Sequence, residues 1–219
     1  MIGDLHCHTT LSDGSLGIED IIVQAKKTGI DFISITDHDT MSSINRAKVL
    51  GERYGVQTIP GVELSAWDKK RNRKVHILCY APQKPDRLEG LCIKSCEIRR
   101  KCAAEMVENV MKLYPITAES VMKHATGSKS IFKQHIMHAL IEYGYTTHFY
   151  GKLNHKLFNH ENGTCIVERE YPDVNFVLDL IHSSKGVAVM AHPMMYDSAE
   201  LLEELAQNGK IDGIEAYHY

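Results

Sequence analysis

Short apolar runs alternate with amphipathic stretches along most of this chain of 219 residues. Apolar runs bounded by turn residues are typical of buried strands, whereas apolar positions three and four residues apart are typical of helices. Their alternation favours parallel strands joined by helices, which is an α/β arrangement. The predicted strands lie at the start of the chain and at residues 31–35, 56–59, 75–80, 186–191 and 213–218, the predicted helices between them at 19–28, 42–54, 175–184 and 201–206, and a charged hairpin or turn at 68–74.

The pattern changes between residues 85 and 166, where helical stretches follow one another and no strand is indicated. We therefore expect two domains, with residues 1–84 and 167–219 forming one and a helical insertion at 85–166 forming the other. The helices expected in the insertion are residues 87–113, 118–125, 131–143 and 147–158.

The first strand carries two histidines whose rings share a face. Residues two apart on a strand point the same way, so His6 and His8 project together while Cys7 points away. With Asp13 one short loop later, the two imidazoles can chelate a divalent metal. Two surface histidines near an N-terminus would have the same local sequence.

Further metal-type ligands accompany the later strands. His38, Glu63 and His192 each follow an apolar run, and His76 lies inside another. Functional residues gather at the carboxyl ends of parallel strands, so we expect these side chains to converge with those of the first strand. A donor set of imidazoles and carboxylates without a thiolate suits Mn²⁺, Fe²⁺ or Zn²⁺.

Composition narrows the class of protein. With 43% hydrophobic residues the chain can bury one substantial core beside a small subdomain. The net charge of −3 argues against a stable long nucleic-acid partner and against an anionic membrane. No apolar stretch approaches the roughly 20 residues of a membrane span, and the first strand leaves no room for a signal peptide. The six cysteines form no CxxC pair, so we expect a reduced, cytoplasmic protein.

Six motifs combine the predicted ligands with turn residues: His6-x-His8, Ser12-Asp13-Gly14, Thr36-Asp37-His38-Asp39, Pro60-Gly61-Val62-Glu63, His76 and Ala191-His192-Pro193. In order and spacing they resemble the PHP (polymerase and histidinol phosphatase) family. Within it the chain is most similar to the branch of nucleoside 3′,5′-bisphosphate phosphatases and 5′-to-3′ exoribonucleases, which carries a helical insertion before the Ala-His-Pro strand. The resemblance implies a distorted (β/α)7 TIM-like barrel of PHP type, with the insertion as its specificity domain.

The resemblance also implies up to three divalent metals, with Mn²⁺ or Fe²⁺ preferred and Zn²⁺ as an alternative. These metals would activate a bridging water as the nucleophile, and Glu63, His192, Asp13 and His38 would be catalytic residues. The implied ligands are His6, His8 and Glu63 for the first metal, Glu63, His76 and His192 for the second, and Asp13 and His38 for the third.

Several neighbouring residues have two open interpretations. Asp37 and Asp39 either orient the imidazoles or are solvated loop carboxylates. Lys133 and His135 lie in a segment that resembles the branch's contact with a substrate phosphate, but Lys133 stands where arginine is usual, and a lysine cannot hold a phosphate bidentately. Lys133 is otherwise an exposed helix lysine. Trp67 either stacks on a nucleobase or packs in the fold.

The sequence departs from the family near its end. PHP members usually carry a last strand with Asp-x-His, and no such segment is present before Tyr219. The first and third metals would then each lack one ligand, unless Glu215 or His218 supplies it. Three explanations for the missing segment stay open: the chain is a truncated product, another chain completes the barrel, or the metal cluster binds its ions more weakly. We also expect an open edge at residues 213–217 that favours self-association.

Taken together, these expectations describe a metal-dependent phosphoesterase acting on a small phosphorylated nucleotide. The favoured reaction is release of the 3′-phosphate from a nucleoside 3′,5′-bisphosphate. The alternatives are a 5′-to-3′ exoribonuclease acting on short RNA, a histidinol-phosphate phosphatase, and a catalytically impaired metal- or nucleotide-binding module.

Overall fold

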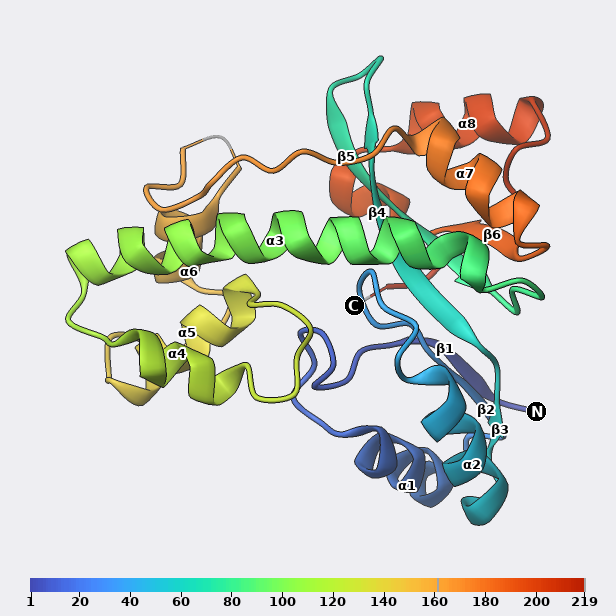
Figure 1. Cartoon of the computed structure of the whole chain (residues 1–219), viewed down its shortest axis with the longest axis horizontal. Helices are drawn as coiled ribbons and strands as arrows, with labels where there is room; N and C mark the ends of the chain where they lie inside the picture. Colours follow the sequence, from blue (N-terminus) through green and yellow to red (C-terminus); the bar gives the residue numbers. More distant parts are fainter. Residues whose placement is uncertain (161, 219) are drawn as a thin grey trace.

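The computed structural model describes residues 1–160 and 162–218. Glu161 and Tyr219 lie outside the described residues. The chain combines helices with two small sheets, which confirms the α/β class (Figure 1). The elements are β1 (Gly3–Cys7), α1 (Ile18–Thr28), β2 (Phe32–Ile35), α2 (Ile44–Tyr54), β3 (Gln57–Thr58), β4 (Gly61–Asp68), β5 (Arg73–Tyr80), α3 (Asp86–Leu113), α4 (Ala118–His124), α5 (Lys133–Glu142), α6 (Lys152–Phe158), α7 (Val174–Ser183), β6 (Val187–Met190), a 3₁₀ turn (Pro193–Tyr196), α8 (Ala199–Gln207) and β7 (Gly213–Ile214).

One sheet has the strand order β1-β2-β3 and is parallel, and the other has the order β4-β5-β6-β7. In the second sheet β5 pairs antiparallel with both β4 and β6, so the expectation of parallel strands throughout is wrong there. For β4 and β5 the reason is the short turn between Asp68 and Arg73, because parallel neighbours need a crossover of a dozen or more residues. Of the two expectations for residues 68–74, a hairpin or a turn, the structure has the hairpin, whose turn lies between Asp68 and Arg73.

The two sheets meet through a single bridge between His38 and Glu63, and the described strands do not close into a barrel. The last predicted strand is also shorter than expected, since β7 pairs only with Val189 and Met190, the end of β6. Backbone pairing thus leaves the metal-type side chains at the junction of the sheets. The (β/α)7 barrel stays a prediction.

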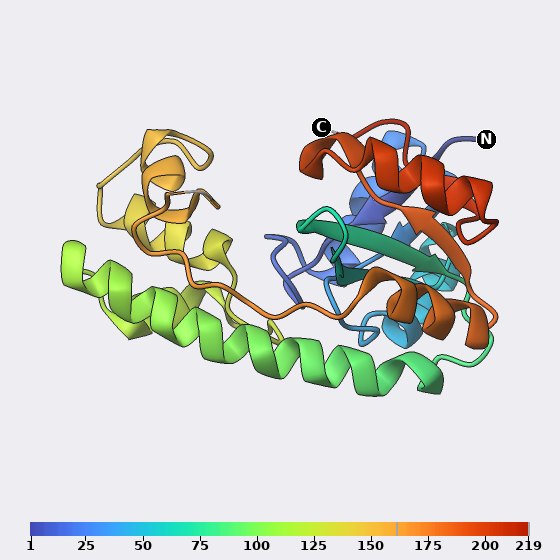
Figure 2. The ribbon, with the colours of Figure 1, turned by 90° about the horizontal axis from the view of Figure 1, so that it is seen from above.

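Three apolar cores hold these elements together. One lies between the first sheet and α1 and α2, and a second lies among β4, β5, β6, α7, α8 and the start of α3. The third joins the second half of α3 with α4, α5 and α6. Helix α3 therefore spans both ends of the molecule, and residues 166–173 return beside it (Figure 2). The domain boundaries at residues 85 and 166 stay a prediction.

Helices α1 and α2 end where the sequence predicts. Gly29 and Gly55 follow their last turns with φ of 78° and 72°, a conformation that glycine adopts without strain. None of the described helices has the length and apolar character needed to cross a membrane.

Candidate metal centre

Glu63 lies at the centre of the predicted ligand set, with its side chain only 1% exposed. Its Oε1 lies 2.6 Å from Nδ1 of His76 and 2.9 Å from Nε2 of His192. Its Oε2 lies 3.3 Å from Nε2 of His6 and 3.1 Å from Nε2 of His8. Each carboxylate oxygen therefore faces a different pair of imidazoles, which is the geometry that a bridging carboxylate requires.

His38 and Asp13 extend the cluster on the Oε2 side of Glu63. His38 Nδ1 lies 3.0 Å from that oxygen, and His38 Nε2 lies 3.6 Å from Oδ2 of Asp13. The other oxygen of Asp13 lies 3.4 Å from Nδ1 of His8. The structure thus brings all the predicted ligands together, and the ion that each would hold stays a prediction.

Strand placement explains this convergence. His6 lies in β1, His38 follows β2, His76 lies in β5 and His192 follows β6. Glu63 does not follow a strand as expected but lies inside β4, whose pairing with β5 begins at Gly61. Its side chain projects from the point where the two sheets meet, which puts it within reach of ligands from both.

The donor atoms fit a divalent metal. Glu63 Oε2 and His38 Nδ1 are buried without a hydrogen bond, as are His76 Nε2 and His192 Nδ1. Buried polar atoms without a partner are costly, and a cation between the first two would satisfy both. Among the described residues, three groups of three have ligand atoms within 4.8 Å of one another: His6 with Glu63 and His192, His8 with His38 and Glu63, and His6 with Glu215 and His218. The last group contains both residues that could supply a missing ligand, and their role as ligands stays a prediction.

The charge states also suit metal binding. Burial alone would raise the pKa of the Glu63 carboxyl, but the imidazoles of His38 and His76 hold it well below its usual value. Burial keeps the pKa of His76 well below its ordinary value, so this ring is neutral. Burial also opposes protonation of His6, yet the hydrogen bond to Glu215 and the nearby charge of Glu63 raise its pKa to about 10. A cation that binds there displaces a proton.

Asp37 and Asp39 are both fully buried, so the interpretation as solvated carboxylates is wrong. Asp37 accepts hydrogen bonds from the backbone and hydroxyl of Thr9 at 2.7 and 2.8 Å and from the hydroxyl of Ser12 at 2.6 Å. Asp39 accepts bonds from the backbone and hydroxyl of Ser65, both at 2.9 Å. They hold the loops that carry the ligands rather than the imidazole rings themselves.

Arg99 is a residue that the sequence did not single out. Its guanidinium is buried and pairs with Asp39, and it lies 4.5 Å from the ring centroid of Phe132. The Phe132 ring in turn stacks on His38 at 5.7 Å. Arg99 lies in a run of charged residues on a long helix, where no spacing distinguishes it from its solvated neighbours.

A cleft of about 1040 Å³ separates the metal-type residues from the insertion. Asp13, His38 and His76 line one side, and Lys133 and Gln134 line the other. Gln134 donates a hydrogen bond to Asp13 at 2.9 Å, so the insertion contacts a predicted ligand directly.

The two predicted substrate-binding residues lie differently. Lys133 is half-buried and its Nζ donates to the carbonyl of Phe158 at 3.1 Å, so it is not an exposed helix lysine. His135 is 3% exposed, and its Nδ1 accepts the backbone N–H of Phe132 at the start of α5. His135 is not among the described residues that line the cleft, and its contact with a substrate stays a prediction.

Further cations and aromatic rings line the same cleft. Lys74 and Arg169 both lie there, and burial together with these two charges lowers the pKa of Lys133 to about 8. Trp67 stacks on Tyr171 at 5.6 Å, and the guanidinium of Arg169 lies 4.3 Å from the Tyr171 centroid. One face of Trp67 is therefore used in packing.

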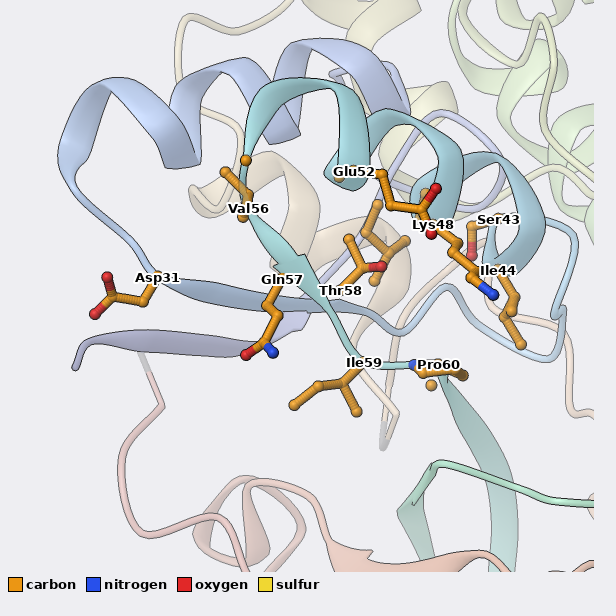
Figure 3. Close-up of a pocket in the computed structure, with 15 residues that line it drawn as sticks. Asp31, Ser43, Ile44, Lys48, Glu52, Val56, Gln57, Thr58, Ile59 and Pro60 are labelled. Atoms are coloured by element: carbon orange, nitrogen blue, oxygen red, sulfur yellow. The ribbon is translucent and has the colours of Figure 1, made fainter.

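A second pocket of about 600 Å³ lies beside α2 and β3 (Figure 3). Its lining includes Ile44, Val56 and Pro60, with Lys48 and Glu52 at the helix. It contains none of the predicted metal ligands. This pocket is therefore separate from the candidate metal centre.

Comparison with known proteins gives a family match over most of the chain. A model of the PHP domain matches residues 4–212. A phosphoribosyl 1,2-cyclic phosphate 1,2-diphosphodiesterase from Eggerthella lenta is 36% identical over 220 residues, covering 100% of this chain and 83% of the relative.

More distant relatives have other substrates in their names. A 5′-3′ exoribonuclease from Haemophilus influenzae is 27% identical over 196 residues, covering 89% of this chain and 69% of the relative. A 3′,5′-nucleoside bisphosphate phosphatase from Chromobacterium violaceum is 26% identical over 206 residues, covering 92% of this chain and 70% of the relative. The crystal structure of a protein from Bifidobacterium adolescentis, assigned as a metal-dependent phosphoesterase, superposes on this chain with a TM-score of 0.89 at 26% identity. The superposition covers 99% of this chain and 77% of the other.

Proposed function

The chain belongs to the PHP domain family and is a metal-dependent phosphoesterase, and on this premise we propose that its substrate is a ribose that carries two phosphate groups. The reacting phosphate ester would lie at the Glu63 cluster, and the second phosphate would lie against Lys74, Lys133 and Arg169. The observation that carries this proposal is that ligand-type residues and cations line one cleft.

The cluster suits phosphate-ester hydrolysis. Divalent cations, when bound, provide hydroxide near neutral pH and neutralise charge on the leaving oxygen. Mn²⁺ or Fe²⁺ are our first candidates, since the donor set is mixed nitrogen and oxygen. The side chains proposed to hold the cations are His6, His8, Asp13, His38, Glu63, His76 and His192.

The cations across the cleft suit a second anionic group. Burial is the largest cause of the lowered pKa of Lys133, and the like charges of Lys74 and Arg169, which repel it, lower that pKa further. A phosphate among them would relieve that repulsion. Binding energy from a phosphate that does not react can also be used to position the one that does.

Two substrates satisfy this description. The 36% identical relative is named for a phosphoribosyl 1,2-cyclic phosphate, which makes such a cyclic ester the first candidate. A nucleoside 3′,5′-bisphosphate, releasing its 3′-phosphate, is the second, because Trp67 and Tyr171 offer aromatic surface in the same cleft.

The proposal is tested by steady-state kinetics of the Mn²⁺-supplemented protein. The substrates compared are a 5-phosphoribosyl 1,2-cyclic phosphate, adenosine 3′,5′-bisphosphate, a 5′-phosphorylated short RNA and an aryl phosphate. One charge-assisted contact is worth about 1.5–3 kcal/mol, so we expect kcat/KM for at least one of the first two to exceed that for the aryl phosphate by about 10- to 100-fold. Equal values for all four would contradict the second phosphate site, and preference for the RNA would indicate an exoribonuclease.

A further inference from the structure

Glu215 follows β7 and uses both of its carboxylate oxygens on residues of the metal centre. Its Oε1 lies 2.9 Å from Nδ1 of His6, and its Oε2 accepts the backbone N–H of His192 at 2.7 Å. The side chain is only 14% exposed. The backbone N–H of Glu215 donates to the carbonyl of Met190 at 2.9 Å, which fixes the position from which the side chain projects.

We propose that Glu215 is a positioning residue that fixes the ring of His6 and the backbone of His192 at the same time. This inference rests on the proposed assignment of His6 and His192 as metal ligands. It differs from a role as a replacement ligand, because Glu215 contacts the nitrogen of His6 that faces away from the cluster.

The two ring nitrogens of His6 have different surroundings. Nε2 points into the cluster, 3.1 Å from Nε2 of His8 and 3.3 Å from Oε2 of Glu63. Nδ1 points to Glu215, which as a carboxylate can only accept a hydrogen bond. Glu215 therefore holds a ring proton on Nδ1, which leaves Nε2 as the nitrogen that can bind a cation.

The second contact of Glu215 stabilises an uncommon backbone conformation. His192 has φ of 27° and ψ of 60°, in a region that residues other than glycine rarely adopt. This turn directs the His192 ring so that Nε2 lies 2.9 Å from Oε1 of Glu63. One carboxylate thus fixes a ligand on each side of Glu63, and the loss of Glu215 should affect both oxygens of the bridge.

Glu215→Gln separates the two contacts with little change in volume. The amide can accept the N–H of His192 or face His6 with its oxygen, but it cannot do both. We expect Mn²⁺ and Zn²⁺ affinity, measured by competition with a fluorescent chelator, to fall about 10- to 100-fold. The matched control is Glu203→Gln on α8, an exposed residue whose bond is to Gln207, and its affinity should stay unchanged.

A second measurement needs no variant. In ¹⁵N spectra of the wild-type protein loaded with diamagnetic Zn²⁺, the His6 ring, assigned with His6→Asn, should carry its proton on Nδ1 and none on Nε2. A proton on Nε2 would overturn the inference, and so would Glu215→Gln with wild-type affinity. Loss of one whole metal equivalent with unchanged affinity for the rest would make Glu215 a ligand and overturn it too. Wild-type protein that binds no metal would instead overturn the assignment of His6 and His192.

Discussion

The buried pair of Arg99 and Asp39 joins the long helix of the insertion to the loop beside His38. Both side chains are almost entirely buried, and Asp39 keeps two further bonds to Ser65. Arg99→Met removes the guanidinium but keeps a long apolar side chain beside Phe132. Removing one partner of a buried pair leaves an uncompensated charge, so we expect the free energy of unfolding to fall by about 3–5 kcal/mol.

The assay is equilibrium urea unfolding followed by circular dichroism. Lys101→Met, an exposed position two residues along the same helix, should change the free energy of unfolding by less than about 0.5 kcal/mol. The double variant Arg99→Met with Asp39→Asn removes both charges and should recover part of the loss. Asparagine tolerates the φ of 51° at position 39 and can still accept the Ser65 N–H. A loss below about 1 kcal/mol in Arg99→Met would show that the buried pair does not stabilise the fold in this way.

The same pair predicts a dependence on acid. Burial would raise the pKa of Asp39, but the charge of Arg99 and the bond from Ser65 lower it to about 2 from an ordinary 3.8. A depressed carboxyl pKa stabilises the fold above the ordinary value and loses that contribution as pH falls through 3.8 towards 2. The difference corresponds to about 2 kcal/mol. Arg99→Met should lose less stability over this pH range than the wild type.

Three further predictions concern the metal centre and the adjoining cleft. Of all single ligand variants, Glu63→Gln should lose the most metal on dialysis, because both oxygens of Glu63 face imidazoles. The control Glu203→Gln should retain all of its metal, and elemental analysis of both variants measures the difference. Lys133→Ala should lower kcat/KM about 10-fold for the two-phosphate substrate and less than about 2-fold for an aryl phosphate. Lys156→Ala, at an exposed position, should change neither value. An equal loss on both substrates would mean that Lys133 does not bind the second phosphate. The raised pKa of His6 contributes to the free energy of unfolding of the metal-stripped protein. This contribution is complete below the ordinary pKa of 6.5 and should be lost as pH rises through about 10. Unfolding curves of His6→Asn should not show this loss of stability at high pH.

The sequence pattern predicts the helices well because their signals are local. Apolar spacing and a following glycine place the ends of α1 and α2 at Gly29 and Gly55. The direction of β5 and β6 is not local, because an antiparallel strand that is buried on both faces, as β5 is, has the same continuous apolar run as a parallel strand. Glu63 is likewise recognised by its motif, while its position inside β4 depends on pairing that no short window contains.

The ligand set is predictable because metal binding demands particular side chains at particular places. The surrounding contacts are not, since they join residues far apart in sequence. Arg99 meets Asp39 across 60 residues, and Glu215 meets His6 across 209. In the sequence these charged residues have no spacing or motif that distinguishes them from charged residues on the surface. Such residues become visible only with the structure.

If the imidazoles around Glu63 form a centre that holds several metals, the purified protein must contain those metals. The most direct test is elemental analysis of protein prepared with Mn²⁺ and freed of loosely bound ions. We expect more than one equivalent of metal per chain, because the two oxygens of Glu63 face separate sets of ligands. Less than about half an equivalent would contradict it.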